Sequence, residues 1–257
     1  MRTAAANLAV PSFQPVKLVP GYRAVSSAIE AHIVRGELQA GTLLPTEHAL
    51  AQQFGVNRST VREAIRQLEQ EGLVTRQGAR RLYVTLPGVH DVAPRAARAL
   101  LLQQVTFREL WQVALVLEPQ AAALAAQAAT PQDVELLQQL VGRMAEHHRG
   151  GGTAEQHADL DVEFHAAVAR ASGNRVLILA REPVNLLYRP SLLRLQQKLP
   201  QSERRNLEAH RRVLAAIAAG DAAQASEWMR KHLVDFQRGY ALAGIPIDTP
   251  LRPQHLA

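Results

Sequence analysis

The chain has 257 residues, of which 47% are hydrophobic and 4% aromatic, and its formal net charge is +6 at pH 7. This length allows one large domain or two modest ones, and the hydrophobic fraction is too high for a globally disordered chain. Because cysteine is absent from the sequence, disulfides, thiolate catalysis and cysteine-ligated metals are excluded, and a metal site must use His, Asp or Glu. The mild basic excess is compatible with nucleic-acid binding but is not diagnostic of it.

Proline and glycine divide the chain into a small block and a large one. The expected segments are a flexible arm over 1–19, a first domain over 20–87, a linker over 88–94, a second domain over 95–240 and a flexible tail over 241–257. Ten basic and six acidic residues precede Gly88, against 19 and 17 after Pro87, so the basic excess is concentrated in the smaller block.

The sequence contains no pattern typical of a membrane span. Its most apolar run, from Trp111 to Ala129, is interrupted by Glu118 and Pro119, whereas a span needs about 20 mostly apolar residues. The apolar piece over 4–10 contains Asn7 and lacks a convincing cleavage site for a signal peptide. We therefore expect a cytoplasmic protein with no membrane partner.

The first block is expected to contain three helices and a hairpin. Apolar residues recur at helical spacing in three stretches that end at glycine: Val25, Ile29 and Ile33 before Gly36, then Ala49, Leu50 and Phe54 before Gly55, then Val61, Ile65 and Leu68 before Gly72. Thr46 and Asn57 are suitable N-caps for the second and third helices. Two β-like runs over 73–75 and 82–85 flank a turn. This order predicts a winged helix-turn-helix.

The second block shows helical patterns only. The expected helices are 95–104, 106–128, 131–148, 154–171, 174–198, 202–219 and 221–240. Short connections make successive helices antiparallel neighbours. The expected fold is therefore mainly α: an N-terminal winged helix-turn-helix, with three helices plus a β-hairpin wing, followed by an all-α antiparallel helical bundle.

The start of the third helix is the most informative stretch of the first block. Polar residues there face away from the apolar stripe: Asn57, Arg58, Ser59, Thr60 and Arg62. The first turn of a recognition helix reaches base edges, and its backbone N–H groups favour phosphate. Arginine can bond two guanine acceptors, while serine and threonine can bond phosphates. Arg80 and Arg81 in the hairpin turn are placed to touch the DNA backbone or minor groove.

Three segments resemble the GntR family of bacterial transcriptional regulators. They are Leu-Pro-Thr-Glu-His-Ala-Leu-Ala from Leu44, Gly-Val-Asn-Arg-Ser-Thr-Val-Arg-Glu-Ala from Gly55 and Leu-Glu-Gln-Glu-Gly-Leu-Val from Leu68. The resemblance covers 20–85. It implies a DNA-binding set of His48, Asn57, Arg58, Ser59, Thr60, Arg62, Gln77, Gly78 and Arg80. Many relatives carry arginine where this chain has His48, and the wing often reads Gly-x-Gly where this chain has only Gly78.

The second block places titratable residues among core positions of three helices. Asp161 and His165 lie one turn apart, His210 falls within an apolar stripe, and His232 follows Met229. One buried histidine is more often a hydrogen-bonded core residue, but three with an aspartate form a ligand set for zinc, nickel, manganese or iron. His157, one turn before Asp161, is a rival ligand. The neighbouring pair His147 and His148 is expected to form a solvated helix end.

The same residues resemble the C-terminal FCD domain of the FadR-like branch of GntR regulators. The resemblance covers about 95–240 and rests on Asp161-x3-His165, Ser172-Gly173-Asn174, Glu208-Ala209-His210, Gly220-Asp221 and His232. It implies an all-helical bundle that binds an effector and dimerises. It also implies that Asp161, His165, His210 and His232 hold a divalent ion, with zinc expected.

One departure bears on the effector. Relatives commonly carry an arginine one helical turn before Glu118, thought to hold an acidic effector, and this chain has Ala114 there. Arg181 or Arg189, from a later helix, could take over that role beside Glu118. The small-molecule effector is expected to be a carboxylate.

The sequence therefore predicts a homodimeric, ligand-responsive transcriptional regulator that is not an enzyme. Dimer symmetry implies a palindromic or pseudo-palindromic double-stranded operator. Two alternatives stay open at this point. The protein could be a constitutive DNA-binding regulator with a purely structural metal, or a metal-dependent hydrolase or lyase with Glu118, Glu163 or Glu208 as general base.

Overall fold

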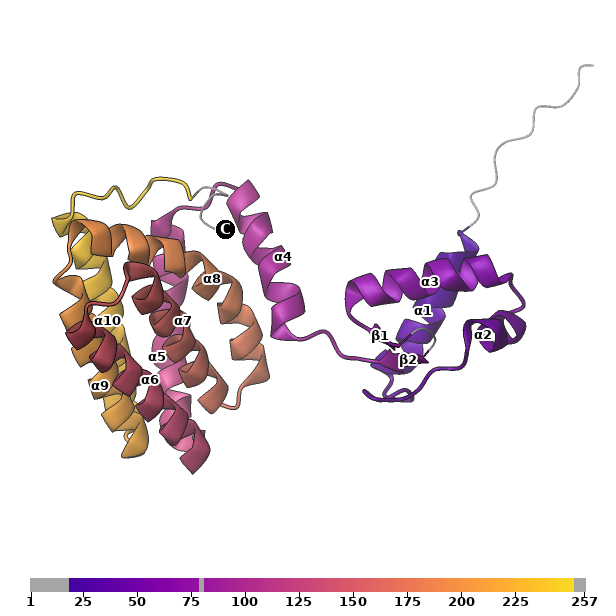
Figure 1. The fold of residues 1–257 in the computed structure, drawn as a ribbon, viewed down its shortest axis with the longest axis horizontal. Coiled ribbons are helices and arrows are strands. Elements are labelled where there is room, and N and C mark those ends of the chain that lie inside the picture. The colour runs from indigo at the N-terminus through magenta and orange to yellow at the C-terminus, as the bar shows by residue number, and fades with distance from the viewer. Residues whose placement is uncertain (1–18, 79–80, 252–257) are drawn as a thin grey trace, which may run out of the picture. The chain divides into compact units, whose positions relative to one another are not determined.

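The computed structural model describes residues 19–78 and 81–251 (Figure 1). The chain divides into two compact units, Met1–Pro87 and Gly88–Ala257, and the boundary falls within the Leu86-Pro87-Gly88 segment. Almost all of the expected N-terminal arm, and Arg80 of the expected wing, lie outside the described residues.

The first unit has the expected order of helices and strands. It consists of α1 (Gly21–Val34), α2 (Glu47–Phe54), α3 (Arg58–Glu71), β1 (Val74–Gln77) and β2 (Arg81–Val84). The strands form an antiparallel hairpin in which Val74 pairs with Val84. Thr46 and Asn57 cap α2 and α3 by accepting backbone N–H bonds, as predicted. The winged helix-turn-helix is thus confirmed.

The core of the first unit fixes which face of α3 is exposed. Val61, Ala64, Ile65 and Leu68 are fully buried on α3 and pack with the apolar residues of α1, α2 and the hairpin. These positions are spaced three and four apart, so they form one stripe along the helix. The opposite face, which begins at the polar N-terminus, is left to solvent.

The second unit is a bundle of antiparallel helices. They are α4 (Val89–Leu102), α5 (Phe107–Ala128), α6 (Pro131–Gly150), α7 (Ala154–Ala171), α8 (Arg175–Lys198), α9 (Ser202–Ala218) and α10 (Ala222–Leu242). Helix α5 contacts α7, α8, α9 and α10, and Figure 1 shows it among these helices. Ala121, Ala122 and Ala125 of α5 are fully buried, so small side chains let the surrounding helices approach closely. In the described ranges no helix is long and apolar enough to cross a bilayer.

The expected linker over 88–94 and the described part of the expected tail, 241–251, are ordered against the bundle. Helix α4 begins at Val89, inside the expected linker, because the Gly88 N–H donates to Asp91 and the stripe of Ala93, Ala97 and Leu101 is buried. Within the expected tail, α10 runs to Leu242, and the Leu251 N–H donates to the Val105 carbonyl at 2.8 Å. Proline and glycine suggested irregular chain in both places, but buried apolar side chains such as Leu101 and Leu251 hold the two segments in the bundle.

Candidate DNA-binding surface and metal centre

The N-terminus of α3 carries a small polar network. Asn57 Oδ1 accepts the Thr60 N–H at 2.8 Å and the hydroxyls of Ser59 and Thr60 at 2.7 Å each. Arg58 and Arg62 are exposed on the same part of the helix. Because Asn57 caps the helix and also holds both hydroxyls, three of the sequence-predicted contacts act as one unit.

A basic hollow lies on this exposed face, between α2, α3 and β1. It is lined by Thr46, Glu47, His48, Arg58, Arg62, Arg66, Glu69 and Arg76. Glu47 holds Arg62 at 3.5 Å and Arg76 at 3.2 Å, so this carboxylate orders two arginines without neutralising the four that line the hollow. The sequence reasoning missed Arg66 and Arg76. Arg66 follows Arg62 by one helical turn and could have been found, whereas Arg76 needs the hairpin to bring it there.

The described part of the wing presents Gln77 and Gly78 to solvent. Gly78 has φ of +64°, a left-handed conformation that favours glycine and starts the turn between the strands. Arg81 begins β2 and is exposed as well. The structure thus places the described wing residues at the tip of the hairpin, where a second DNA contact is expected.

The second unit brings Asp161, His165, His210 and His232 together. One ligand atom from each lies within 4.8 Å of the others, and all four residues are buried. They come from α7, α9 and α10. His165 Nε2 lies 3.2 Å from His232 Nε2, and His210 Nε2 lies 3.5 Å from Asp161 Oδ1. Such distances between ligand atoms are what a single ion with bonds of about 2.0–2.2 Å would produce.

A further layer of contacts orients these ligands. Glu118 of α5 accepts from His165 Nδ1 at 3.0 Å and from Arg181 Nε at 2.6 Å. Asn206 donates to Asp161 Oδ1 at 2.7 Å. A carboxylate behind a histidine fixes its tautomer and turns the other ring nitrogen towards a metal. Glu118 therefore supports the ligand group instead of belonging to it.

His210 supplies the strongest sign that the group fits a cation. Its Nδ1 donates to Met144 Sδ at 3.3 Å, which leaves the Nε2 lone pair facing the other ligands. Nε2 is buried and has no hydrogen-bond partner among the described residues. A buried polar atom without a partner is costly, and a metal ion would remove that cost.

The charges of the group follow from burial and from Glu118. Burial lowers the pKa of His210 well below its usual range and that of His232 to about 4, so both are neutral at pH 7. Burial also opposes the charge on His165, but Glu118 outweighs it and raises the pKa of that imidazole. The pKa of Glu118 itself falls to about 2, because Arg181 and His165 outweigh its burial. Neutral imidazoles beside carboxylates suit zinc, nickel, manganese or iron.

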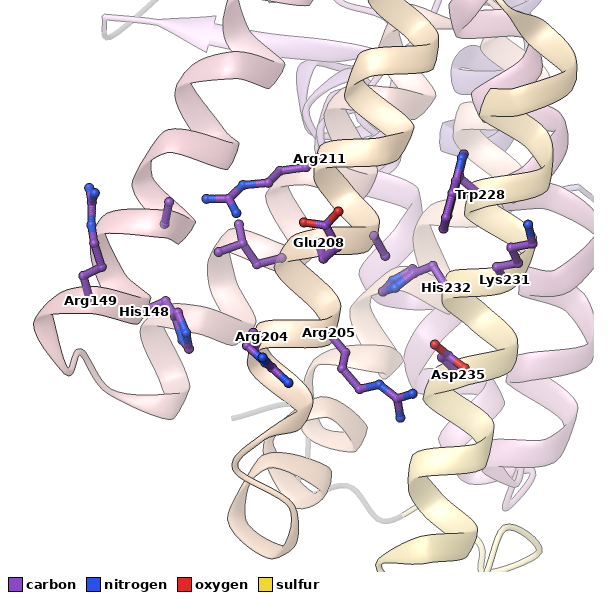
Figure 2. A pocket seen from close by; sticks show the side chains of 13 residues that line it. His148, Arg149, Arg204, Arg205, Glu208, Arg211, Trp228, Lys231, His232 and Asp235 are labelled. Carbon is purple, nitrogen blue, oxygen red and sulfur yellow. The ribbon is translucent and has the colours of Figure 1, made fainter.

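A second hollow, of about 560 Å³, opens between α6, α9 and α10 and reaches His232 (Figure 2). Five cationic side chains line it: Arg149, Arg204, Arg205, Arg211 and Lys231. Glu208 and Asp235 are the acidic residues of its lining. The sequence reasoning missed this hollow, although the arginine doublets at 204–205 and 211–212 were a visible signal.

The inner cavity beside the ligands is small. It is lined in part by Ala114, Glu118 and His165, and its free volume of about 20 Å³ is close to what one water molecule needs. Neither candidate arginine lines it. Arg181 is buried against Glu118, and Arg189 pairs with Asp159 on the outer surface at 2.6 Å. The structure therefore does not bring Arg189 to the place left by the arginine that Ala114 replaces.

Three further histidines of the bundle, His147, His148 and His157, lie outside the four-ligand group. His157 is buried but lies outside the four-ligand group, with Nε2 facing Asn206 at 3.3 Å. His147 is partly buried and turns back onto the chain, donating from Nε2 to the Thr153 carbonyl at 2.8 Å. It therefore does not form a solvated helix end. His148 is exposed, as expected.

A winged helix-turn-helix followed by a helical bundle with a buried His/Asp group defines a class of DNA-binding transcription regulator. Residues 21–84 match the model for "Bacterial regulatory proteins, gntR family", and residues 109–235 match the FCD domain. The chain belongs to the GntR family and carries an FCD domain, which confirms the resemblance seen in the sequence. The matched family model describes bacterial regulatory proteins, and the matched relatives are transcription regulators and not enzymes.

Individual relatives agree with this assignment. The chain is 32% identical to the HTH-type transcriptional regulator LutR of Bacillus subtilis over 80% of this chain and 94% of that protein. It is 30% identical to the Glc operon transcriptional activator of Escherichia coli, over 75% and 78%. The solved structure of a Streptococcus agalactiae GntR protein matches with 27% identity and a TM-score of 0.60, covering 84% of this chain and 99% of that one.

Proposed function

We propose that this protein is a metabolite-responsive regulator whose operator binding depends on a metal ion and a small organic acid held in the helical unit. The observation that carries this proposal is His210, whose Nε2 is buried without a partner in the described structure and faces two imidazoles and a carboxylate. A metal group and a DNA-binding helix in one chain suggest that one regulates the other. Such a regulator works in the cytoplasm, where bacterial DNA lies.

The DNA-binding half of the proposal uses the exposed face of α3. Arg58 and Arg62 would contact bases and phosphates, and the hydroxyls that Asn57 holds would contact the DNA backbone. His48, Arg66 and Arg76 extend the same hollow, and the two arginines add positive charge. Gln77, Gly78 and Arg80 of the wing would make the second contact.

The proposed metal ligands are Asp161, His165, His210 and His232, with zinc as the expected ion and nickel, manganese or iron as alternatives. When bound, the ion supplies positive charge that a carboxylate can coordinate directly. Glu118 holds the His165 proton at Nδ1 and thereby keeps Nε2 available as a ligand. Arg181 keeps Glu118 ionised and in position.

The effector is proposed to be an organic acid that enters from the basic hollow of Figure 2. The inner cavity has room for about one water molecule, whereas the outer hollow has the size of a small-molecule site. Five cationic side chains in its lining attract an anion, and His232 on its wall is also a proposed metal ligand. A carboxylate could therefore reach the ion at His232.

The protein is further proposed to be a homodimer that binds a palindromic operator. The exposed aliphatic side chains of the bundle include Val113 and Val116 of α5, and Val176 and Leu179 of α8. Exposed aliphatic surface of this kind suits a second copy of the chain. Sedimentation velocity would show a dimer that Val116→Lys weakens, and a wild-type monomer at operator-binding concentrations would contradict this part of the proposal.

The central test measures operator affinity by fluorescence anisotropy for metal-loaded and chelator-stripped protein, each with a panel of small organic acids. We expect an acid to change the affinity of the metal-loaded protein only, and His210→Ala to abolish that response. His90→Ala, an exposed histidine of α4, is the matched control. If chelation changes melting but no acid changes operator affinity in either form, the metal is purely structural and the proposal fails.

A further inference from the structure

A second histidine–carboxylate cluster lies where the end of α6 meets the starts of α7 and α9. It consists of His147, His157 and Glu203, each with a ligand atom within 4.8 Å of the others. Glu203 Oε1 lies 3.2 Å from His147 Nδ1 and 3.6 Å from His157 Nδ1. None of the three residues belongs to the group around His210.

These separations match the edges of a metal polyhedron. A tetrahedral zinc ion with bonds of about 2.0–2.1 Å to nitrogen and oxygen holds its ligand atoms about 3.3 Å apart. The two distances from Glu203 Oε1 lie on either side of that value. His148 Nδ1 lies 3.4 Å from the same oxygen but outside the compact group, so it can donate to Glu203 and orient it.

A hydrogen bond to the backbone orients the His147 ring so that its Nδ1 faces Glu203. Its Nε2 donates to the Thr153 carbonyl at 2.8 Å, so a neutral ring presents the lone pair of Nδ1 to the carboxylate. Two acceptors at 3.2 Å require a proton or a cation between them. The ring also occupies the space beside Gly152, where a Cβ atom would overlap His147 Cδ2. Glycine at that position therefore allows the ring its place.

His157 provides an independent sign of a ligand. It is 1% exposed, and its Nδ1, which points to Glu203, has no hydrogen-bond partner in the part of the chain that the structure describes. Its Nε2 lies 3.3 Å from the Asn206 amide nitrogen, which makes a shorter bond of 2.7 Å to Asp161. When a cation binds Nδ1, the ring proton moves to Nε2, which can then no longer accept a hydrogen bond from Asn206. That 3.3 Å contact is lost, while the shorter bond from Asn206 to Asp161 remains.

We propose that His147, His157 and Glu203 form a second binding site for a divalent transition-metal ion of the zinc class, with a fourth position open to water. Imidazole nitrogens with one carboxylate are ligands that zinc, cobalt and nickel accept. An ion there joins the ends of three helices beside the basic hollow, because His148 and Arg204, neighbours of His147 and Glu203 in the sequence, line that hollow.

The test counts metal ions in untagged, full-length protein. Chelator-stripped protein is titrated with Co²⁺ and followed by visible absorption, and zinc content is then determined by elemental analysis after dialysis. We expect two equivalents for wild type, one for Glu203→Gln, one for His210→Ala and none for the double variant. Glu146→Gln removes an exposed carboxylate next to His147 on α6 and should keep two equivalents.

The outcomes separate the two sites. One equivalent in wild type that His210→Ala removes and Glu203→Gln leaves unchanged would overturn the second site, because the cluster would then be a protonated histidine–carboxylate pair. Two equivalents in Glu203→Gln would overturn it as well. If His210→Ala loses nothing while Glu203→Gln loses one, the second site stands and the first does not. His147→Gln repeats the test at a residue nearer the surface, in case Glu203→Gln does not fold.

Discussion

The two units of this protein carry their polar functional groups in opposite ways. In the winged helix, the arginines of α3 are exposed and the core beneath them consists of apolar residues. In the helical unit, charged and titratable side chains such as Glu118, Arg181 and His210 are inside the bundle. In the first unit the candidate functional residues lie on the surface and take no part in the core. In the second unit the candidate functional residues are themselves part of the core.

This difference determines how function and stability are linked. Removing an exposed arginine leaves the core of the winged helix intact, so DNA affinity should change without a change in unfolding. Removing a buried charge leaves its former partner buried without a counter-charge. The bundle should then become less stable, and it should also bind any ligand less tightly. The two tryptophans, Trp111 and Trp228, both lie in the helical unit, so their fluorescence reports the unfolding of that unit alone.

Arg181→Ala should have the largest effect. Arg181 is 2% exposed and donates to Glu118 at 2.6 Å, so its removal leaves a buried carboxylate without its main partner. Breaking a buried ion pair costs about 3–5 kcal/mol. We expect that loss in urea unfolding followed by tryptophan fluorescence.

Arg189→Ala on the same helix is the matched control for Arg181→Ala. Arg189 is about one-third exposed and pairs with Asp159, so its loss should cost about 0–1 kcal/mol. Equal losses in the two variants would contradict the comparison between buried and exposed charge. The double variant Arg181→Met/Glu118→Gln removes both charges of the buried pair. A stability restored towards that of wild type would support the comparison between buried and exposed charge.

Metal removal should have the next largest effect, and only in the helical unit. An ion that binds the folded state alone stabilises it by about 2.7–4.1 kcal/mol when its free concentration is about 100–1,000 times its dissociation constant. Chelation should lower the tryptophan-monitored unfolding free energy by that amount. Hydrogen exchange of peptides from 21–84 should stay unchanged, and loss of their protection would show that the two units do not respond separately.

Arg62→Ala should act on DNA binding alone. A good arginine–base contact contributes about 1–3 kcal/mol of discrimination, and a phosphate contact adds to the salt dependence of binding. We expect weaker operator binding with unchanged protection of residues 21–84. Arg35→Ala, at the end of α1 and outside the basic hollow, should bind as wild type. Unaltered operator affinity in Arg62→Ala would remove this residue from the interface.

The fold could be predicted from the sequence because local signals and core pattern agree. Thr46 and Asn57 cap the helices they were expected to cap, and glycines end α2 and α3 in the left-handed conformation. Helix α4 begins at Val89 and not at the predicted residue 95, because the Gly88 N–H donates to Asp91 and the buried stripe begins at Ala93. The packing of the segment around Leu251 depends on a contact with Val105 that is distant in the sequence.

The candidate sites could be predicted only where they follow one helix or a known spacing. The group of Asp161, His165, His210 and His232 was expected and lies together in the structure. The cluster around Glu203 was not expected, because it joins three helix ends that no periodicity connects. The partner of Arg189 could not be predicted either, because Asp159 lies on another helix. The sequence left Arg189 as a candidate for effector binding, whereas in the structure it pairs with Asp159.

Asn57 allows the smallest but sharpest test of the comparison, because this residue serves both stability and function. Asn57→Ala removes the N-cap of α3 and should cost about 1 kcal/mol of the stability of the winged helix. It also frees the hydroxyls of Ser59 and Thr60, so operator affinity should fall as well.

Asn57→Asp separates the two roles. Aspartate caps a helix as well as asparagine does, and the positive end of the helix dipole favours its charge. The same charge faces the phosphates of DNA, so we expect unchanged hydrogen-exchange protection of α3 with weaker operator binding. The loss should shrink as salt screens the repulsion. Equal operator affinity of Asn57→Asp and wild type would place the N-terminus of α3 away from the DNA, and Arg58 would then lose its proposed role too.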